Sequence, residues 1–233
     1  MERISEIVDV RERQHVLDFL ARPDPNQVCP VKVLYYGHSF VSHMQDYMAT
    51  LPYHMANFGI SDNEAWVYFK ALNGAPLDRL KKKANLNKVN RMQPEVVILE
   101  GGTNDLADVN NSAADVCEMM LELVRWVLDC RVREVVVSQV LKRGKKGLIG
   151  YDPDYESKMF EYNHRIEDAL QHLPRASFWH HRKLWGDIEG YVQDGTHLND
   201  IGHKKLYRSL RGAIQSTVVR IRPAWSSQNY YYL

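Results

Sequence analysis

Five short apolar runs, separated by longer amphipathic segments, constrain the fold of this chain more than any other feature. The runs cover residues 31–36, 65–69, 95–100, 134–140 and, more weakly, 176–180. Their apolar stretches are nearly continuous, which is typical of parallel strands that helices cover on both faces. The alternation therefore predicts an α/β fold, a three-layer α/β/α sandwich with a five-stranded parallel sheet and right-handed crossovers.

The amphipathic segments include two helices with clear sequence signals. After the third run, Ser112 and Asp115 have the spacing of a capping box, and apolar residues then recur at helical spacing as far as Leu128. A later helix begins near Asp200. Its apolar side consists of Leu206, Leu210, Ala213 and Ile214, with basic residues mostly around the other side. Both apolar faces are expected to pack on the sheet.

The two ends of the chain fall outside this alternation. Residues 1–30 predict an N-terminal helix and a linker, because the proline-containing segment at 22–26 interrupts the helical pattern. Residues 222–233 predict a C-terminal tail. The domain that carries the function is expected over residues 31–221.

Composition excludes several classes of protein. The chain has 233 residues, 45% hydrophobic and 25% charged, so it is neither a disordered chain nor a disulfide scaffold. With Lys+Arg 30 against Asp+Glu 29, the net charge of +1 provides no overall field that would favour nucleic acid or an acidic membrane. Charge is segregated nonetheless: residues 70–91 carry seven basic and one acidic side chain, and residues 92–130 carry one basic and eight acidic. The sequence is therefore still compatible with a basic surface that guides an anionic partner.

The N-terminus and the cysteines bear on location. The first residues are charged where a signal peptide needs an apolar run, and no apolar stretch reaches the roughly 18 residues of a membrane span. Three cysteines without a CxxC pair are typical of free thiols in a reducing compartment. We therefore expect a soluble, cytoplasmic protein, and a monomer.

Four loops carry polar residues suited to chemistry. Ligands of parallel sheets bind at the carboxyl ends of the strands, so the residues after each run are informative. These loops contain Gly37-His38-Ser39, Asn73-Gly74, the GGTND sequence at 101–105 and, ahead of the last helix, the DGTHLN sequence at 194–199. Taken alone, each of these short sequences is more often a structural feature than a functional one: a helix cap, a turn or a structural histidine. Together, at one edge of a sheet, they favour a functional site.

The residue types fit nucleophilic catalysis. A serine hydroxyl needs an adjacent base whose imidazole is oriented by a carboxylate, and Ser39, His197 and Asp194 can fill these roles. The three-residue spacing of Asp194 and His197 lets one turn bring the two side chains together. The carbonyl that serine attacks becomes an oxyanion. Candidate donors for this oxyanion hole are the backbone N–H groups of Ser39 and Gly74 and the side-chain amide of Asn104.

The order GHS, Asn-Gly, GGTND and DGTHLN resembles the four sequence blocks of the SGNH, or GDSL-type, hydrolases over about residues 31–217. The resemblance implies a flavodoxin-like fold and a carboxylic ester hydrolase, an esterase, lipase-like enzyme or O-deacetylase, that needs no metal and no cofactor. It places the nucleophile at Ser39, the base at His197 with Asp194 before it, and the oxyanion donors at Gly74 and Asn104. We expect a small-molecule ester with an acetyl or short acyl group as substrate.

One departure from the family concerns His38, which stands where the family usually has an aspartate outside the triad. The GHSFV variant also resembles, more weakly, esterase-like domains of animal transposable elements. We predict that His38 contacts the substrate, as do Trp185 and Tyr191, which lie close to the Asp194 loop. The basic segment 142–146 follows the fourth run and would attract an anionic substrate at the rim of the site, although a solvated loop is the simpler interpretation.

Two functions of other classes stay open. The GHS departure motivates a catalytically silent SGNH fold that binds a nucleic acid or a protein partner. The second alternative is a nucleotide or phosphate binder that uses the turn at 101–103. This function gives no role to the DGTHLN sequence. The sequence has no P-loop, no G-x-G-x-x-G after a strand and no H-E-x-x-H. It therefore lacks the usual motifs of nucleotide-dependent and zinc-dependent enzymes.

Overall fold

The chain divides into two units, Met1–Pro30 and Val31–Leu233. The computed structural model describes residues 29–145, 152–184 and 188–222, and the fold given below is that of the second unit. The predicted N-terminal helix and all but the first residue of the predicted C-terminal tail lie outside the described residues. The predicted domain boundaries therefore stay a prediction.

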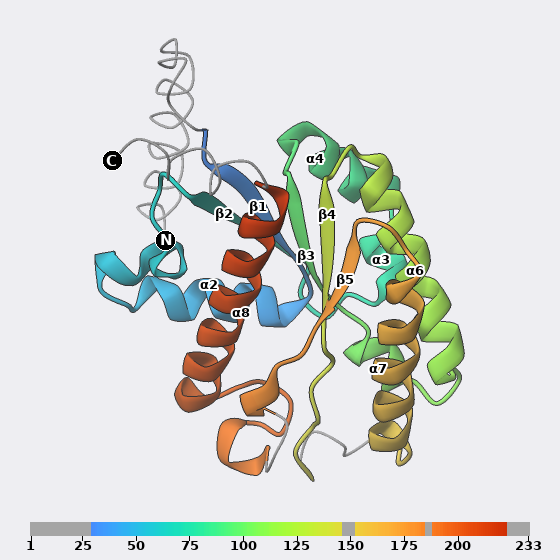
Figure 1. The fold of residues 1–233 in the computed structure, drawn as a ribbon. Helices are drawn as coiled ribbons and strands as arrows, with labels where there is room; N and C mark the ends of the chain where they lie inside the picture. Colours follow the sequence, from blue (N-terminus) through green and yellow to red (C-terminus); the bar gives the residue numbers. More distant parts are fainter. Residues whose placement is uncertain (1–28, 146–151, 185–187, 223–233) are drawn as a thin grey trace. The chain divides into compact units, whose positions relative to one another are not determined.

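Five parallel strands form one sheet in the order β2-β1-β3-β4-β5, which confirms the predicted sandwich (Figure 1). The strands are β1 (Val31–Gly37), β2 (Ala65–Ala71), β3 (Val96–Glu100), β4 (Glu134–Ser138) and β5 (Ala176–Trp179). Because β1 pairs with β2 on one side and β3 on the other, the strand order reverses there. Such a reversal opens a crevice at the carboxyl ends of β1 and β3.

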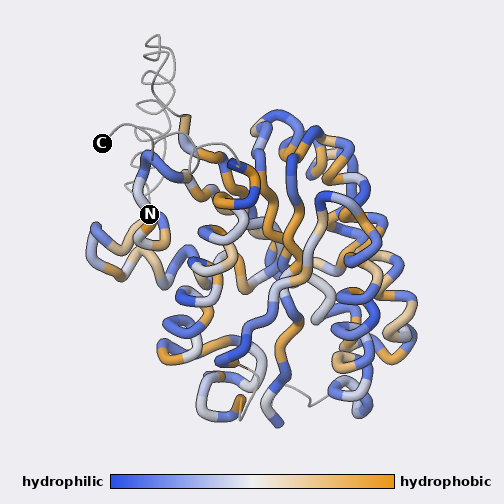
Figure 2. The backbone as a smooth tube through the Cα atoms, viewed as in Figure 1, coloured by the Kyte–Doolittle hydropathy of each residue, from blue (hydrophilic) through white to orange (hydrophobic). Residues whose placement is uncertain are grey.

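Helices cover both faces of this sheet. Among the described residues they are α2 (Ser39–Ala49), α3 (Leu77–Leu80), α4 (Lys83–Met92), α5 (Thr103–Leu106), α6 (Ala113–Asp129), α7 (Tyr155–Gln171) and α8 (Asp200–Ile221), with 3₁₀ turns at Tyr53–Gly59, Arg182–Leu184 and Glu189–Tyr191. The apolar side chains of α2 and α8 form one core with the sheet, and those of α3, α6 and α7 form the other. Figure 2 shows apolar residues running along the central strands between these layers.

Both helices with clear sequence signals are present. The Ser112 hydroxyl accepts from the Asp115 N–H at 3.1 Å, and the Ser112 N–H donates to the Asp115 carboxylate at 3.0 Å, so the predicted capping box starts α6. At the start of α8 the Asn199 side chain accepts from the Gly202 N–H at 3.0 Å. The residues predicted for the apolar side of α8 are buried against the sheet.

Strand β4 ends two residues before the end of the apolar run that predicted it. The Asn163 side chain accepts from the Val140 N–H at 3.0 Å and donates to the Val140 carbonyl at 2.9 Å. The Gln139 N–H still donates to the Trp179 carbonyl of β5 at 3.0 Å, and the Gln139 side chain accepts from the His181 N–H at 2.8 Å. The Asn163 side chain thus satisfies the backbone of Val140 in place of a neighbouring strand.

A buried carboxyl group closes the end of β3. Glu100 is 3% exposed, and Tyr35 Oη donates to its carboxyl at 3.1 Å. Burial raises the pKa of Glu100 to about 7, against which the hydrogen bond from Tyr35 acts. The backbone is crowded at the same place, because a Cβ on Gly37 would lie 2.0 Å from the Glu100 carbonyl oxygen. Only glycine lets β1 and β3 approach this closely.

Glu100→Gln is expected to remove a pH dependence of stability. Between the ordinary pKa of 4.5 and the folded-state value of about 7, the folded protein keeps a proton that the unfolded chain has lost. The stability of the unmutated protein should therefore fall as pH rises through this window, and glutamine has no proton to lose. The unfolding free energy of the variant relative to the parent should increase by about 2.5 kcal/mol between pH 5 and pH 8. Urea unfolding at both pH values measures this, and parallel pH dependences would contradict it.

Candidate active site

Ser39 is positioned by the turn between β1 and α2. It is the first residue of α2, so its backbone N–H has no acceptor within the helix. His38 precedes it, and its Nδ1 accepts from the Phe40 N–H at 3.4 Å as the helix cap. The half-buried Ser39 therefore lies at the carboxyl ends of the central strands, where the order of the sheet reverses.

Asp194 and His197 share one tight loop ahead of α8. One carboxylate oxygen of Asp194 accepts from the N–H groups of Thr196 at 2.8 Å and His197 at 2.7 Å. The other lies 2.7 Å from His197 Nδ1. Partial burial by itself raises the pKa of Asp194, but the hydrogen bonds from the His197 ring and from the two backbone groups lower it to about 2. The carboxylate is therefore charged at neutral pH.

The loop faces Ser39. His197 Nε2 lies 3.1 Å from Ser39 Oγ, so the three residues predicted as a triad form one continuous chain of hydrogen bonds. With Nδ1 donating to Asp194, Nε2 is left to accept from the serine hydroxyl. This is the geometry that proton transfer from a serine nucleophile requires.

The candidate oxyanion donors come from the two neighbouring loops. Gly74 has a φ of +65°, a left-handed conformation that favours glycine. The Ser42 hydroxyl donates to the Asn73 side chain at 2.7 Å and so ties this loop to α2. The side-chain N–H of Asn104 donates to the Ala75 carbonyl at 3.3 Å. The structure therefore brings Asn104 beside the Gly74 loop, and that loop beside the helix of Ser39.

Two residues near the site were missed by the sequence interpretation. Buried Asp105 accepts from the Leu77 N–H at 2.9 Å and so holds the start of α3, which follows the Gly74 loop, against α5. Burial raises its pKa to about 6. The ring of His43 stacks on that of His197, with centroids 4.4 Å apart and planes 22° apart. His43 lies four residues after Ser39, a helical spacing that places both on one face of α2 and could have indicated it.

The three predicted substrate contacts have different environments. His38 is 1% exposed, and burial, followed by the charges of Arg143 and His197, lowers its pKa to about 3. Tyr191 is half-buried, with Lys205 Nζ 4.4 Å from its ring centroid. Trp185 lies outside the described residues. Contact of these side chains with a substrate stays a prediction.

The simpler interpretation of the basic segment as a solvated loop is wrong for Arg143. This side chain is only 7% exposed, and its Nη2 donates to the Thr103 carbonyl at 3.1 Å and to Asn104 Oδ1 at 3.3 Å. The next residue, Gly144, donates its N–H to the Gly195 carbonyl at 2.7 Å. The segment thus runs between the Asn104 loop and the loop of Asp194, which a charge pattern alone does not reveal.

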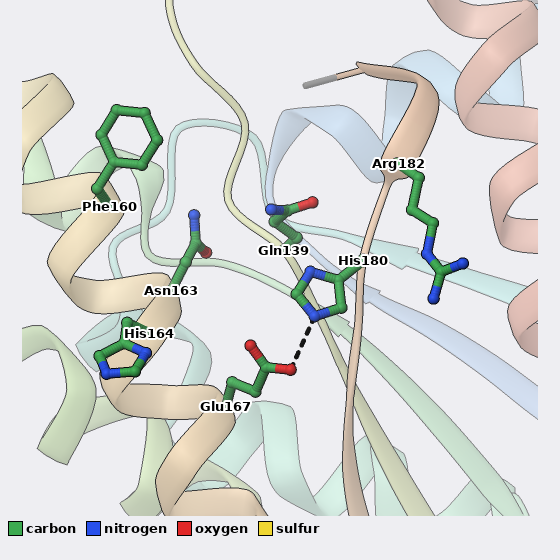
Figure 3. A pocket seen from close by; sticks show the side chains of 7 residues that line it. All are labelled: Gln139, Phe160, Asn163, His164, Glu167, His180 and Arg182. Carbon is green, nitrogen blue, oxygen red and sulfur yellow. Dashed lines mark hydrogen bonds and ion pairs between the residues drawn. The ribbon is translucent and has the colours of Figure 1, made fainter. Parts of the chain in front are cut away.

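A cavity is lined by residues of α7 together with Gln139, His180 and Arg182, and in Figure 3 the ring of His180 points toward Glu167 on α7. His180 Nε2 lies 2.8 Å from Glu167 Oε1 there. Among the described residues that line the cavity there is no serine, threonine or cysteine that this histidine–carboxylate pair could activate. In the part of the chain that the structure describes, no three His, Cys, Asp or Glu side chains gather as a metal site, and no helix is long and apolar enough to cross a bilayer.

Comparisons with known proteins extend these observations. Residues 35–205 match the model of the GDSL-like lipase/acylhydrolase family. No curated protein matches the chain. Similar solved structures include a GDSL-like lipase from Bacteroides thetaiotaomicron, with a TM-score of 0.61 at 16% identity over 89% of this chain and 97% of that one. A family 3 carbohydrate esterase from Talaromyces cellulolyticus has a TM-score of 0.60 at 14% identity, over 82% of this chain and 99% of that one. An acetylxylan esterase from Geobacillus stearothermophilus has a TM-score of 0.60 at 15% identity, over 81% of this chain and 96% of that one. At these identities the structures show a shared fold.

Proposed function

The chain belongs to the GDSL-like lipase/acylhydrolase family, and we propose that it is a serine esterase that hydrolyses small carboxylic esters through Ser39, His197 and Asp194. The observation that carries the proposal is the unbroken hydrogen-bond chain from Ser39 Oγ through His197 to Asp194, at 3.1 and 2.7 Å. A structural histidine has no need of a nucleophile on one nitrogen and a charged carboxylate on the other.

In the proposed reaction His197 Nε2 takes the proton of Ser39 as Oγ attacks the ester carbonyl carbon. Asp194 stabilises the imidazolium that results and holds its orientation. The carbonyl oxygen becomes an oxyanion, which the N–H groups of Ser39 and Gly74 and the amide of Asn104 stabilise. The C–O bond then breaks, and His197 returns its proton to the departing alcohol. A water molecule, deprotonated by His197, attacks the acyl-serine and releases the carboxylic acid and the free serine.

We infer that the acyl group is acetyl or another short chain. The support is the fold that the chain shares with a carbohydrate esterase and an acetylxylan esterase. A panel of p-nitrophenyl esters from acetate to decanoate measures this preference. The largest kcat/KM is expected at two to four carbons.

The proposal is tested directly by a fluorophosphonate, which bonds covalently only to an activated serine. One adduct is expected, on the peptide that contains Ser39, and Ser39→Ala should take up none. Ser216→Ala, which removes a hydroxyl from the distant part of α8, is the matched control and should be labelled as fully as the unmutated protein. Absence of both labelling and ester turnover in a folded protein would overturn the proposal and favour the silent binding module.

A further inference from the structure

The guanidinium of Arg143 is fixed by its surroundings. Its Cζ lies 5.0 Å from the ring centroid of Tyr155, and Nη2 donates to Thr103 and Asn104. Tyr155 is itself held, because its hydroxyl donates to the Leu141 carbonyl at 3.0 Å and lies 2.7 Å from Thr103 Oγ1. The group is thus set between α5 and α7 with little freedom to move.

We propose that Arg143 is a positioning residue for the oxyanion hole, which fixes the side-chain amide of Asn104 so that its N–H group, and not its oxygen, is presented to the reacting carbonyl. The inference rests on the proposed esterase function. It assigns a role to a residue outside the four sequence blocks of the site.

The orientation follows from the donors and acceptors around Asn104. A guanidinium has only donors, so the amide atom that faces it must be the oxygen. On its other side the amide faces the carbonyl of Ala75, an acceptor, at 3.3 Å. A flipped amide would set N–H against the N–H donors of Arg143 and oxygen against oxygen at Ala75. Both contacts therefore favour one orientation, and the N–H group lies on the side of the Gly74 loop.

The charge of Arg143 also acts directly on the reaction, with a smaller effect than the one through Asn104. Negative charge on the carbonyl oxygen exists only in the transition state and intermediate, so an interaction with it raises kcat more than it lowers KM. Arg143 is buried, and the field of a buried cation is screened less than that of an exposed one. The field of Arg143 reaches His38, the residue beside the nucleophile. After burial, the charge of Arg143 is the largest cause that lowers the pKa of His38.

Kinetics of Arg143→Met and Arg143→Lys test the proposal. Loss of one preoriented oxyanion donor costs about 10² to 10³ in kcat, so we expect Arg143→Met to lower kcat for p-nitrophenyl acetate about 100-fold, with KM changed less than about threefold. Lysine keeps the charge but not the planar fork, and should recover at least about fivefold of the loss. Lys145→Met removes an exposed charge from the same segment and is the matched control, with kcat within about twofold.

A double-mutant cycle separates positioning from general structural damage. If Arg143 acts through Asn104, Arg143→Met should lower kcat less than about fivefold in an Asn104→Ala background. Equal losses in both backgrounds, or no loss in the single variant, would overturn the proposal. Circular dichroism and urea midpoints establish that each variant is folded, and Arg143→Lys carries the test if the methionine variant does not fold.

A readout independent of activity keeps this inference separate from the esterase proposal. The side-chain amide of Asn104, identified in the ¹⁵N–¹H spectrum by its loss in Asn104→Ala, should give one sharp pair of resonances that shifts or broadens in Arg143→Met. An unchanged pair would contradict the inference even in an active enzyme. A changed pair in a protein without Ser39-dependent turnover would support the contact while the proposed function failed.

Discussion

Ser39→Ala is expected to lower kcat for a short aryl ester by at least about 10⁴-fold. The substitution removes Ser39 Oγ, which lies 3.1 Å from His197 Nε2. The imidazole and Asp194 then have no nucleophile to activate. The activity that remains comes from the oxyanion donors and substrate binding, which in serine hydrolases still exceed the reaction in water by about 10³ to 10⁴.

The variant should keep its fold, which makes the result interpretable. Ser39 begins α2, and alanine has a helix propensity at least as favourable as that of serine. We expect the unfolding free energy to change by less than about 1 kcal/mol. Steady-state kinetics and urea unfolding measure the two quantities, and Ser216→Ala should match the parent in both. Unchanged turnover in Ser39→Ala would show that another residue carries the reaction.

Asp194→Asn is expected to lower kcat by about 10⁴-fold, through the tautomer of His197. One oxygen of Asp194 accepts from the N–H groups of Thr196 and His197 at 2.8 and 2.7 Å. The asparagine carbonyl must occupy this position, because an NH₂ group there would face two donors. The NH₂ group then faces His197 Nδ1 and donates to it. Nδ1 becomes the acceptor, Nε2 carries the proton, and the ring can no longer accept the proton of Ser39.

The loss should appear in kcat while the chain stays folded with a similar affinity for substrate. Steady-state kinetics at pH 7 to 9 measure it, and Asp200→Asn, at an exposed position just after the loop, controls for the loss of one negative charge. A decrease below about tenfold would mean that the backbone of the loop alone orients His197. The carboxylate would then be a stabiliser of the loop and no member of a triad.

Much of the fold could be predicted from the sequence, because its signals are local. Parallel strands that helices cover on both faces are continuous apolar runs. Each of the five apolar runs corresponds to one strand of the sheet. The loop of Asp194 and His197 could be predicted as well, since a three-residue spacing lets a carboxylate contact the following imidazole within a single turn. The contact between this loop and Ser39 followed only from the rule that the carboxyl ends of parallel strands meet at one edge.

The features that could not be predicted depend on contacts between residues of distant elements. Arg143 lies in a run of basic residues whose simplest environment is water, and its burial depends on Thr103 and Tyr155. Asp105 stands in a recognisable block, but nothing near it in the sequence indicates that it holds Leu77. Strand β4 ends early because Asn163, on α7, bonds to Val140. In each case a tertiary contact overrides a local tendency.

The hydrogen bond between Ser39 and His197 joins residues 158 positions apart. The nucleophile belongs to the first helix after β1, and the base belongs to the loop ahead of α8, which packs on the same face of the sheet. A growing polypeptide therefore contains its serine long before the histidine is made, and the hydrogen bond between them can form only once the loop ahead of α8 is in place. In the proposed esterase, turnover would therefore report on the placement of the loop ahead of α8 as well as on the chemistry of Ser39.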